Sequence, residues 1–337
     1  MRTSGQIKKF ILDNLTFHKK DIIQASINHF GISRQPMHKH MKSLIEDKKV
    51  IAFGNTKGRY YKLNPSVNFT KNFPITNDIS TFTILKNILP NITFLRNNIF
   101  EIFEFSIGAL INNVFDHSNA NSIYFKLYIN HRDSHFILSD DGIGIFNKIK
   151  TGLELANTRI AGLELAKGNI TTDPTNHSGD ELNAIIHLFD EVTIDSSGNS
   201  LKFFNDNNEW LIQNSKQLHG TRIHLKIDTQ SKRSCAKIFE LIFKKKHRHI
   251  SIPINLLELG DYKIINCRSQ VKNLLRNIKN YKIIEFDFRK IDLIGPSFAD
   301  ALVRKTKEYN KYANIEWINT NPTVDLLMSR ALDRQSE

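Results

Sequence analysis

Cysteine and long apolar runs are both scarce in this 337-residue chain. Its two cysteines, Cys235 and Cys267, lack the spacing of a metal site, and we expect both to be reduced thiols, as in the cytosol. No apolar run approaches the roughly 18 residues that a membrane helix needs. The polar residues after Met1 lead into an amphipathic helix, unlike the apolar core of a secretion signal. We therefore predict a cytoplasmic protein that has no membrane partner.

Positive charge is distributed unevenly along the chain. The formal net charge is +13, and residues 1–63 hold 13 Lys and Arg against 4 Asp and Glu, a net charge of +9. An excess of one sign in a small segment favours a polyanionic partner for that segment. A solubilising surface would give the same counts. A chain of this length divides into two or three domains.

Helical periodicity dominates the first 64 residues. Ile7, Phe10 and Ile11 share one helix face, and residues 21–30 repeat the pattern up to Gly31, a typical helix end. A third helix is predicted after Ser33, a typical N-cap, with an apolar stripe formed by Met37, Met41, Leu44 and Ile45.

Two short strand patterns follow the third helix. Residues 50–53 and 59–63 flank a loop that has Gly54 and Gly58 at its ends, which predicts a hairpin. Three helices and a basic hairpin over 1–64 resemble the winged helix-turn-helix domain of bacterial regulators.

The resemblance implies that the third helix enters the major groove of DNA. The side chains nearest to base edges would be Arg34, Gln35, His38 and Lys39, and those on phosphates would be Lys42, Lys57 and Arg59. A winged helix that contacts another protein is the alternative.

The next segment contains signals that break regular structure. Residues 64–74 include two prolines, and a helical pattern from Ile79 to Leu89 is broken by Pro90 and Asn91. We interpret residues 65–93 as a linker with a helical piece.

Several polar residues lie close together at the centre of the chain. One long helix, or two, over 94–115 is followed there by strands over 121–129 and 135–139. Asn113 lies one turn before His117 on the helix, and an Asn amide oxygen there can bind a metal that carries phosphates. The second strand runs into an Asp-x-Gly-x-Gly sequence made of Asp140, Gly142 and Gly144. The carboxylate can accept a hydrogen bond from the exocyclic amine of adenine, and the glycines allow the backbone to approach the base.

Asp-x-Gly-x-Gly alone is equally typical of a plain turn. Three companions strengthen the nucleotide interpretation: the Asn-x-x-x-His helix, a polar stretch from Gly168 to Gly179 with Thr171 and Thr172, and a closing strand that begins at Thr221.

Together, residues 94–228 resemble the ATP-binding domain of gyrase, Hsp90, histidine kinases and MutL, the GHKL superfamily, and especially its small anti-sigma-type ATPases. The resemblance implies an α/β sandwich that binds ATP and Mg²⁺. It assigns the magnesium ligand to Asn113, adenine recognition to Asp140, the first glycine box to Gly142 and Gly144, the second to Gly179, and a place near the adenine-side waters to Thr221.

Two positions depart from the family pattern. Ala109 occupies the position where the family has Glu or Asn, and a methyl group cannot deprotonate an attacking water. Glu181 replaces a glycine of the second box, and Glu104 is the nearest substitute base but lies on another helix face. We therefore assign no catalytic residue and expect ATP binding without efficient hydrolysis. A domain that has lost nucleotide binding is the alternative.

The last part of the chain has a β-α-β-α-β-α pattern from Lys263 onward. Residues 268–271 and 285–300 closely resemble the STAS-like domain of unknown function that is fused to such ATPases. In anti-anti-sigma factors a serine at the start of the second helix is phosphorylated, which makes Ser297 a possible phosphoacceptor. Here Gly295 replaces the family's preceding Asp, and a plain N-cap role for Ser297 is the simpler interpretation.

The sequence thus predicts a multidomain α+β and α/β protein that regulates transcription by binding DNA and ATP. ATP would shift the relative populations of domain arrangements. A protein partner would bind the STAS-like domain, and a homodimer is possible on DNA. The alternatives are a serine kinase that acts on a STAS domain and a scaffold with a degenerate pocket. The predicted segments are 1–64 winged helix, 65–93 linker, 94–228 GHKL domain, 229–260 connector and 261–337 STAS-like domain.

Overall fold

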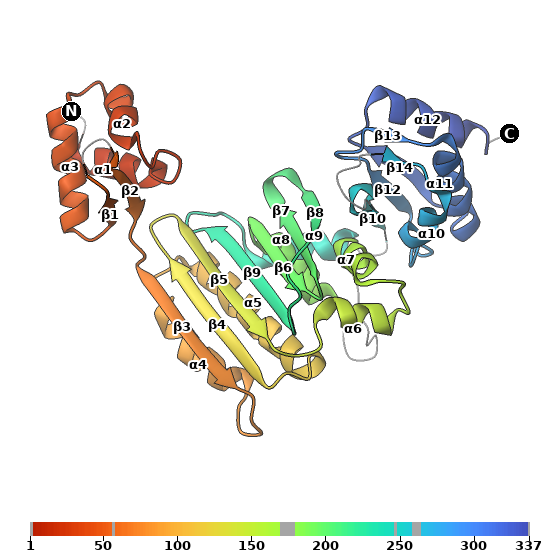
Figure 1. The fold of residues 1–337 in the computed structure, drawn as a ribbon, viewed down its shortest axis with the longest axis horizontal. Coiled ribbons are helices and arrows are strands. Elements are labelled where there is room, and N and C mark those ends of the chain that lie inside the picture. Colours follow the sequence, from red (N-terminus) through yellow and green to blue (C-terminus); the bar gives the residue numbers. More distant parts are fainter. Residues whose placement is uncertain (1–2, 56–57, 169–178, 246–247, 258–263, 336–337) are drawn as a thin grey trace.

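The computed structural model describes residues 3–55, 58–168, 179–245, 248–257 and 264–335. Three parts follow one another along the chain, and the central one is built on a seven-stranded sheet (Figure 1). We refer to residues 3–64 as the N-terminal part, 65–245 as the central part and 248–335 as the C-terminal part. Within the described ranges, no helix is both long and apolar enough to cross a membrane.

The N-terminal part consists of three helices and a hairpin, as predicted. Its elements are α1 (Ser4–Asn14), α2 (Ile22–Phe30), α3 (Arg34–Glu46), β1 (Val50–Phe53) and β2 (Tyr60–Leu63). α1 begins with a capping box between Thr3 and Gln6, and α2 ends at Gly31, whose φ of 62° is left-handed. Ser33 precedes α3 as predicted, but its side chain makes no capping hydrogen bond.

The N-terminal part folds around a hydrophobic core of its own. Met37, Met41 and Leu44 of α3 are buried in that core as the sequence predicts, whereas Ile45 packs against its edge. Burial of one face leaves the opposite face of α3 to solvent.

The central sheet is antiparallel throughout, with the order β3-β4-β5-β9-β6-β7-β8. Its strands are β3 (Val67–Pro74), β4 (Ser122–Ile129), β5 (Asp133–Asp140), β6 (Glu191–Ser196), β7 (Asn199–Phe204), β8 (Glu209–Asn214) and β9 (Thr221–Asp228). The strands predicted over 121–129 and 135–139 are confirmed as β4 and β5.

The linker predicted over 65–93 is wrong in its first part, over residues 67–74. This segment is the edge strand β3, which pairs with β4 from Val67 opposite Ile129 to Pro74 opposite Ser122. Prolines are tolerated on edge strands, because one side of such a strand needs no ladder hydrogen bonds. Pro74 therefore belongs to the edge strand, whereas Pro65 precedes it.

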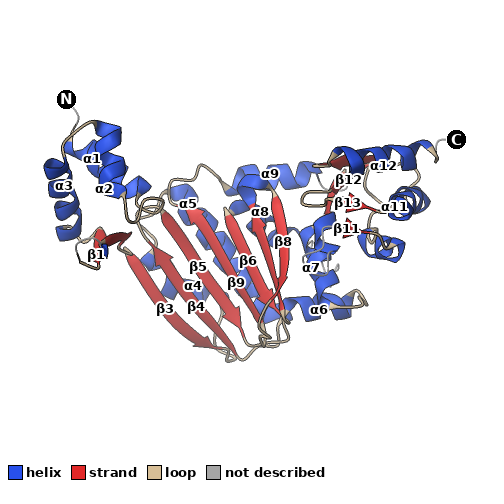
Figure 2. Cartoon of the chain, turned by 45° about the horizontal axis from the view of Figure 1, so that its top comes forward, coloured by secondary structure: helices blue, strands red, loops and turns tan. Residues whose placement is uncertain are grey.

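Helices cover one face of the central sheet, with α4, α5 and α8 behind the strands in Figure 2. The helices of the central part are α4 (Thr81–Ile88), α5 (Asn97–His117), α6 (Ile145–Gly152), α7 (Thr158–Ala166), α8 (Asp180–Leu188) and α9 (Cys235–Lys245). Short 3₁₀ turns occur at Leu89–Asn91 and Asn205–Asn207. Alternate residues of β4, such as Ile123 and Phe125, are buried toward the helices, while Tyr124 is exposed on the other face.

The C-terminal part contains a parallel sheet in the order β10-β12-β14. Its elements are β10 (His249–Pro253), a 3₁₀ turn (Ile254–Leu257), β11 (Ile264–Ile265), a 3₁₀ turn (Arg268–Gln270), α10 (Val271–Leu274), β12 (Ile283–Asp287), β13 (Leu293–Ile294), α11 (Pro296–Tyr309), β14 (Asn314–Ile318) and α12 (Pro322–Asp333). The predicted connector over 229–260 is wrong at its end, because β10 pairs with β12 as part of this sheet.

One continuous hydrophobic core extends through both the central and C-terminal parts. A buried ion pair lies at the end of α7, close to the C-terminal part: Lys167 Nζ lies 2.6 Å from Glu164 Oε1, and each side chain is 2% exposed. Burial raises the pKa of Glu164 and lowers the pKa of Lys167, and the attraction between the two charges opposes both shifts. Lys167 also donates to the carbonyl of Arg276 at 3.4 Å, and Arg276 donates to the carbonyl of Leu153 at 3.5 Å.

We predict that Lys167→Met lowers the free energy of unfolding by about 3 kcal/mol or more, because it removes the ion-pair partner of the buried Glu164 carboxylate. Urea unfolding followed by tryptophan fluorescence measures the change. The double variant Glu164→Leu with Lys167→Met should recover most of the loss. Lys244→Met removes a cation from the exposed pair with Glu240 and should change stability by less than about 1 kcal/mol. A double variant as unstable as the single one would contradict this explanation.

Candidate functional site

Asp140 ends β5 with a carboxyl group that is almost fully enclosed, since the residue is 9% exposed. Its Oδ1 accepts a hydrogen bond from the Gly142 amide at 2.9 Å. Burial raises the pKa of Asp140, and hydrogen bonds from Gly142 and Thr221 oppose the shift. The side chain is thus held in place at the strand end.

The loop after Asp140 is fastened to the end of α5. The Ile143 amide donates to the Ser118 carbonyl at 2.8 Å, and a Cβ on Gly142 would lie 2.2 Å from that same oxygen. Only glycine fits position 142 at this distance.

Two further glycines complete a backbone cradle. Gly144 has a φ of +84°, and a Cβ there would lie 2.5 Å from Ser196 Oγ. Gly220 has a φ of +79°, and its Cβ would lie 2.0 Å from the carbonyl oxygen of Asp140. The backbone is therefore closely packed at one end of the interior strands, where β5 and β6 end and β9 begins.

Thr221 joins the start of β9 to the start of α6. Its Oγ1 accepts a hydrogen bond from the Ile145 amide at 2.9 Å, and Ser196 Oγ donates to the Gly220 carbonyl at 3.0 Å. The structure thus brings the predicted residues Asp140, Gly142, Gly144 and Thr221 together. Ser196 was not predicted, and its only signal in the sequence is its place beside the turn at Gly198.

Asn113 and His117 lie on the last two turns of α5, and Asn113 is partly buried. Asn113 precedes Ser118, the residue fastened to the loop, by five positions, about 7.5 Å along the helix axis. Ala109 is buried one turn earlier on α5, whereas Glu104 is exposed.

Gly179 caps α8 with a left-handed φ of 72°. Glu181 in the first turn is exposed, so its carboxylate faces solvent. A Cβ on Gly168 would lie 3.0 Å from the side chain of Asn183, which brings the end of the α7 segment beside the first turn of α8. Residues 169–178 between these glycines, including the predicted Thr171 and Thr172, lie outside the described residues. No three His, Cys, Asp or Glu side chains form a metal-binding group in the part of the chain that the structure describes.

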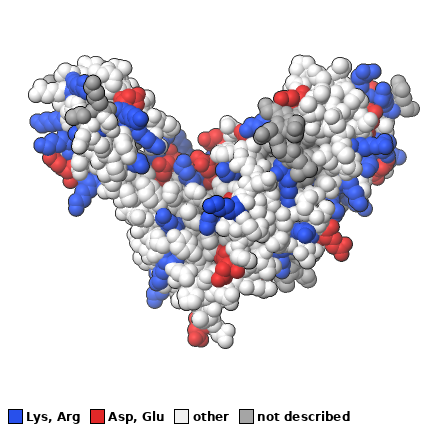
Figure 3. Space-filling view, viewed as in Figure 1, with Lys and Arg blue, Asp and Glu red and all other residues white. Residues whose placement is uncertain are grey.

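The residues predicted to bind DNA share the solvent face of α3. Exposed there are Arg34, Gln35, His38, Lys39 and Lys42. The Nε of Arg34 donates to His38 at 3.3 Å, and Lys42 lies 3.8 Å from Glu46. Figure 3 shows Lys and Arg side chains gathered along the outer rim of the N-terminal part, where α3 lies.

The hairpin adds a second basic surface. Arg59 is exposed, with its guanidinium 5.5 Å from the centre of the Tyr61 ring, and Lys57 lies outside the described residues. Lys62 was not predicted, yet its ammonium lies 5.3 Å from the centre of the Phe53 ring. Its signal in the sequence is that it directly follows the aromatic residues Tyr60 and Tyr61 on β2.

Ser297 is exposed in the first turn of α11. The predicted N-cap role of Ser297 is wrong. Gly295 is the N-cap, because Pro296 takes the first helical position, where proline is favoured. The hydroxyl is therefore accessible without being committed to a capping role.

We predict that Gly142→Ala lowers the free energy of unfolding by at least about 2 kcal/mol, because the new methyl group would collide with the Ser118 carbonyl. Gly108→Ala is the matched control. It lies within α5 and its Cβ would meet only the Leu85 side chain at 3.6 Å, so it should be neutral or stabilising by up to about 1 kcal/mol. Thermal unfolding of both variants measures the difference, and an equal effect of the two changes would contradict the close fit at Gly142.

Comparison with known proteins identifies the C-terminal part. Residues 271–325 match the family model of a STAS-like domain of unknown function (DUF4325). The match begins at α10 and extends into α12, in agreement with the predicted resemblance. No curated protein matches the chain. The chain therefore carries a STAS-like domain, which is compatible with a regulatory role.

Proposed function

We propose that this protein is a transcription regulator that binds DNA through a winged helix and ATP through a GHKL domain, with the STAS-like domain as a further regulatory contact. The observation that carries the proposal is the glycine cradle around Asp140, fastened to the end of α5. A buried carboxylate beside closely approaching backbone is suited to a planar base that offers an amine hydrogen.

The surroundings of the cradle fit a magnesium nucleotide. Asp140 and Thr221 would hold the adenine, and the amides at Gly142 and Gly144 would lie against it. Asn113 offers an amide oxygen for Mg²⁺, and phosphate oxygens would complete the coordination shell. The N-terminus of α8, which follows Gly179, carries the positive end of the helix dipole, which favours a phosphate.

Two residues of α5 favour ATP binding over ATP hydrolysis. Ala109 is buried and offers no base, and Glu104 is exposed on α5. A serine kinase would need such a base, so this alternative is the weaker one. The exposed Glu181 leaves the first turn of α8 open to phosphate, which speaks against a pocket closed by that carboxylate.

β9 offers a physical connection between the nucleotide site and the N-terminal part. It begins at Thr221 in the cradle and ends at Asp228, which lies 3.1 Å from the Nε of Arg132. Arg132 donates to the carbonyl of Asp13 in the N-terminal part at 2.9 Å, and His131 lies 2.9 Å from the Asp13 carboxylate. A nucleotide that displaces the start of β9 would therefore bias the position of the DNA-binding helix.

We predict that the purified protein binds ATP in the presence of Mg²⁺ and that Asp140→Asn weakens binding at least about tenfold, because a hydrogen bond to a charged acceptor is lost. Isothermal titration calorimetry measures both affinities. Asp141→Asn is the control, since the Asp141 carboxylate accepts from Asn121 and Ser122 at the start of β4 and not from the glycine loop. Absence of binding in the wild type would overturn the nucleotide assignment.

We predict that the protein binds duplex DNA and that Lys42→Gln reduces the slope of log affinity against log salt by about one, because one phosphate contact is lost. Fluorescence anisotropy with a labelled random-sequence duplex, with and without ATP, gives the slope. Lys216→Gln removes an equal charge from an exposed loop of the central part and should leave the slope unchanged. A wild type that binds no DNA would favour a winged helix used for protein contact.

A further inference from the structure

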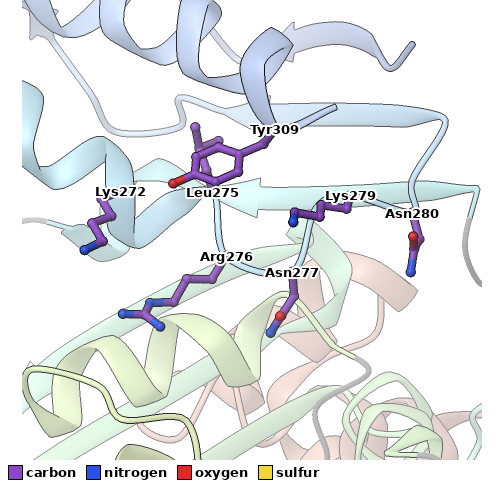
Figure 4. A pocket seen from close by; sticks show the side chains of 7 residues that line it. All are labelled: Lys272, Leu275, Arg276, Asn277, Lys279, Asn280 and Tyr309. Atoms are coloured by element: carbon purple, nitrogen blue, oxygen red, sulfur yellow. The ribbon is translucent and has the colours of Figure 1, made fainter. Parts of the chain in front are cut away.

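A pocket of about 580 Å³ opens on the C-terminal part, away from the glycine cradle. Its polar lining consists of Lys272, Arg276, Lys279, Asn277, Asn280 and Tyr309 (Figure 4). The volume lies within the range of small-molecule sites. Lys272 lies on α10, four of these residues come from the segment that follows α10, and Tyr309 ends α11.

The residues that line the pocket carry a positive charge. It holds three cations and no carboxylate. Among the described residues, Lys272, Arg276 and Lys279 form no ion pair, and the Nε of Arg276 is buried without an acceptor. Buried donors that lack an acceptor are costly, and gathered cations repel one another, so an anion would relieve both effects.

We propose that this pocket binds a small phosphate-bearing molecule. Arg276 lines the pocket, and its guanidinium has a planar fork that would match phosphate oxygens once it turns from Leu153. Lys272 and Lys279 add mobile point charges. The amides of Asn277 and Asn280 supply neutral donors at the rim. The Tyr309 ring, which is 42% exposed, offers a flat surface for an organic group attached to the phosphate.

Arg276 links this pocket to the segment that follows the glycine cradle. Its Nη1 donates to the carbonyl of Leu153 at the end of α6, and its own carbonyl accepts from Lys167 after α7. A phosphate that draws the guanidinium into the pocket would weaken the contact with Leu153, since one side chain serves both. A ligand bound in the C-terminal part would thereby weaken the hydrogen bond that holds the end of α6, the helix that begins directly after Gly144.

The test is calorimetric titration of the full-length protein with inorganic pyrophosphate, without divalent cations and at low salt. Wild type should bind, and the double variant Lys272→Gln with Lys279→Gln should lose at least about tenfold in affinity. Both lysines are exposed, so their replacement leaves the hydrophobic core untouched. Lys282→Gln, an exposed lysine outside the pocket lining, should bind as the wild type does.

Asp140→Asn separates this site from the proposed nucleotide site. Pyrophosphate affinity that survives Asp140→Asn but falls in the double lysine variant supports the pocket, whether or not ATP binds at Asp140. Three outcomes would overturn the proposal: no binding by the wild type, equal losses in the double variant and Lys282→Gln, or loss only in Asp140→Asn. Binding of duplex DNA at these lysines without any binding of pyrophosphate would also overturn it, because it would indicate a polymeric partner.

Discussion

The hydrogen bond from the Ile143 amide to the Ser118 carbonyl fixes the geometry on which the central part depends. It attaches the loop after β5 to the end of α5, so the helix layer and the sheet meet at a defined point. Because the loop lies so close to α5, position 142 must be glycine. The same closeness leaves the Asp140 carboxyl enclosed, with its pKa raised by burial. A proposed ligand site therefore arises from a packing constraint between two secondary-structure elements.

From this point, contacts extend toward both ends of the chain. β9 runs from Thr221 at the loop to Asp228, which lies near the contact between Arg132 and the N-terminal part. α6 and α7 lead in the other direction, to the buried pair of Glu164 and Lys167 and to Arg276 in the STAS-like domain. The central part thus contacts each neighbour through specific polar groups, which is the physical requirement for coupling between sites.

Elements with strong local periodicity could be predicted from the sequence, among them the helices of the N-terminal part and strands β4 and β5. β3 and β10 were missed, because an edge strand gains its stability from a partner far away in the chain and its own pattern is weak. The cap at Gly295 was missed, because Pro296 shifts the helix start by two residues relative to Ser297. The basic pocket was missed as well, since Tyr309 joins Lys272 and Lys279 only through the packing of α11.

The distribution of hydrophobic cores bears on how such a chain is assembled over evolutionary time. The N-terminal part has a separate core, whereas the central and C-terminal parts share one. A gene fusion or exchange at the boundary near Asn64 would leave both cores intact, so the N-terminal part can be replaced while the rest is retained. An exchange near residue 248 would divide a shared core and expose apolar surface. The central and C-terminal parts are therefore expected to be inherited together, while the N-terminal part varies independently of them.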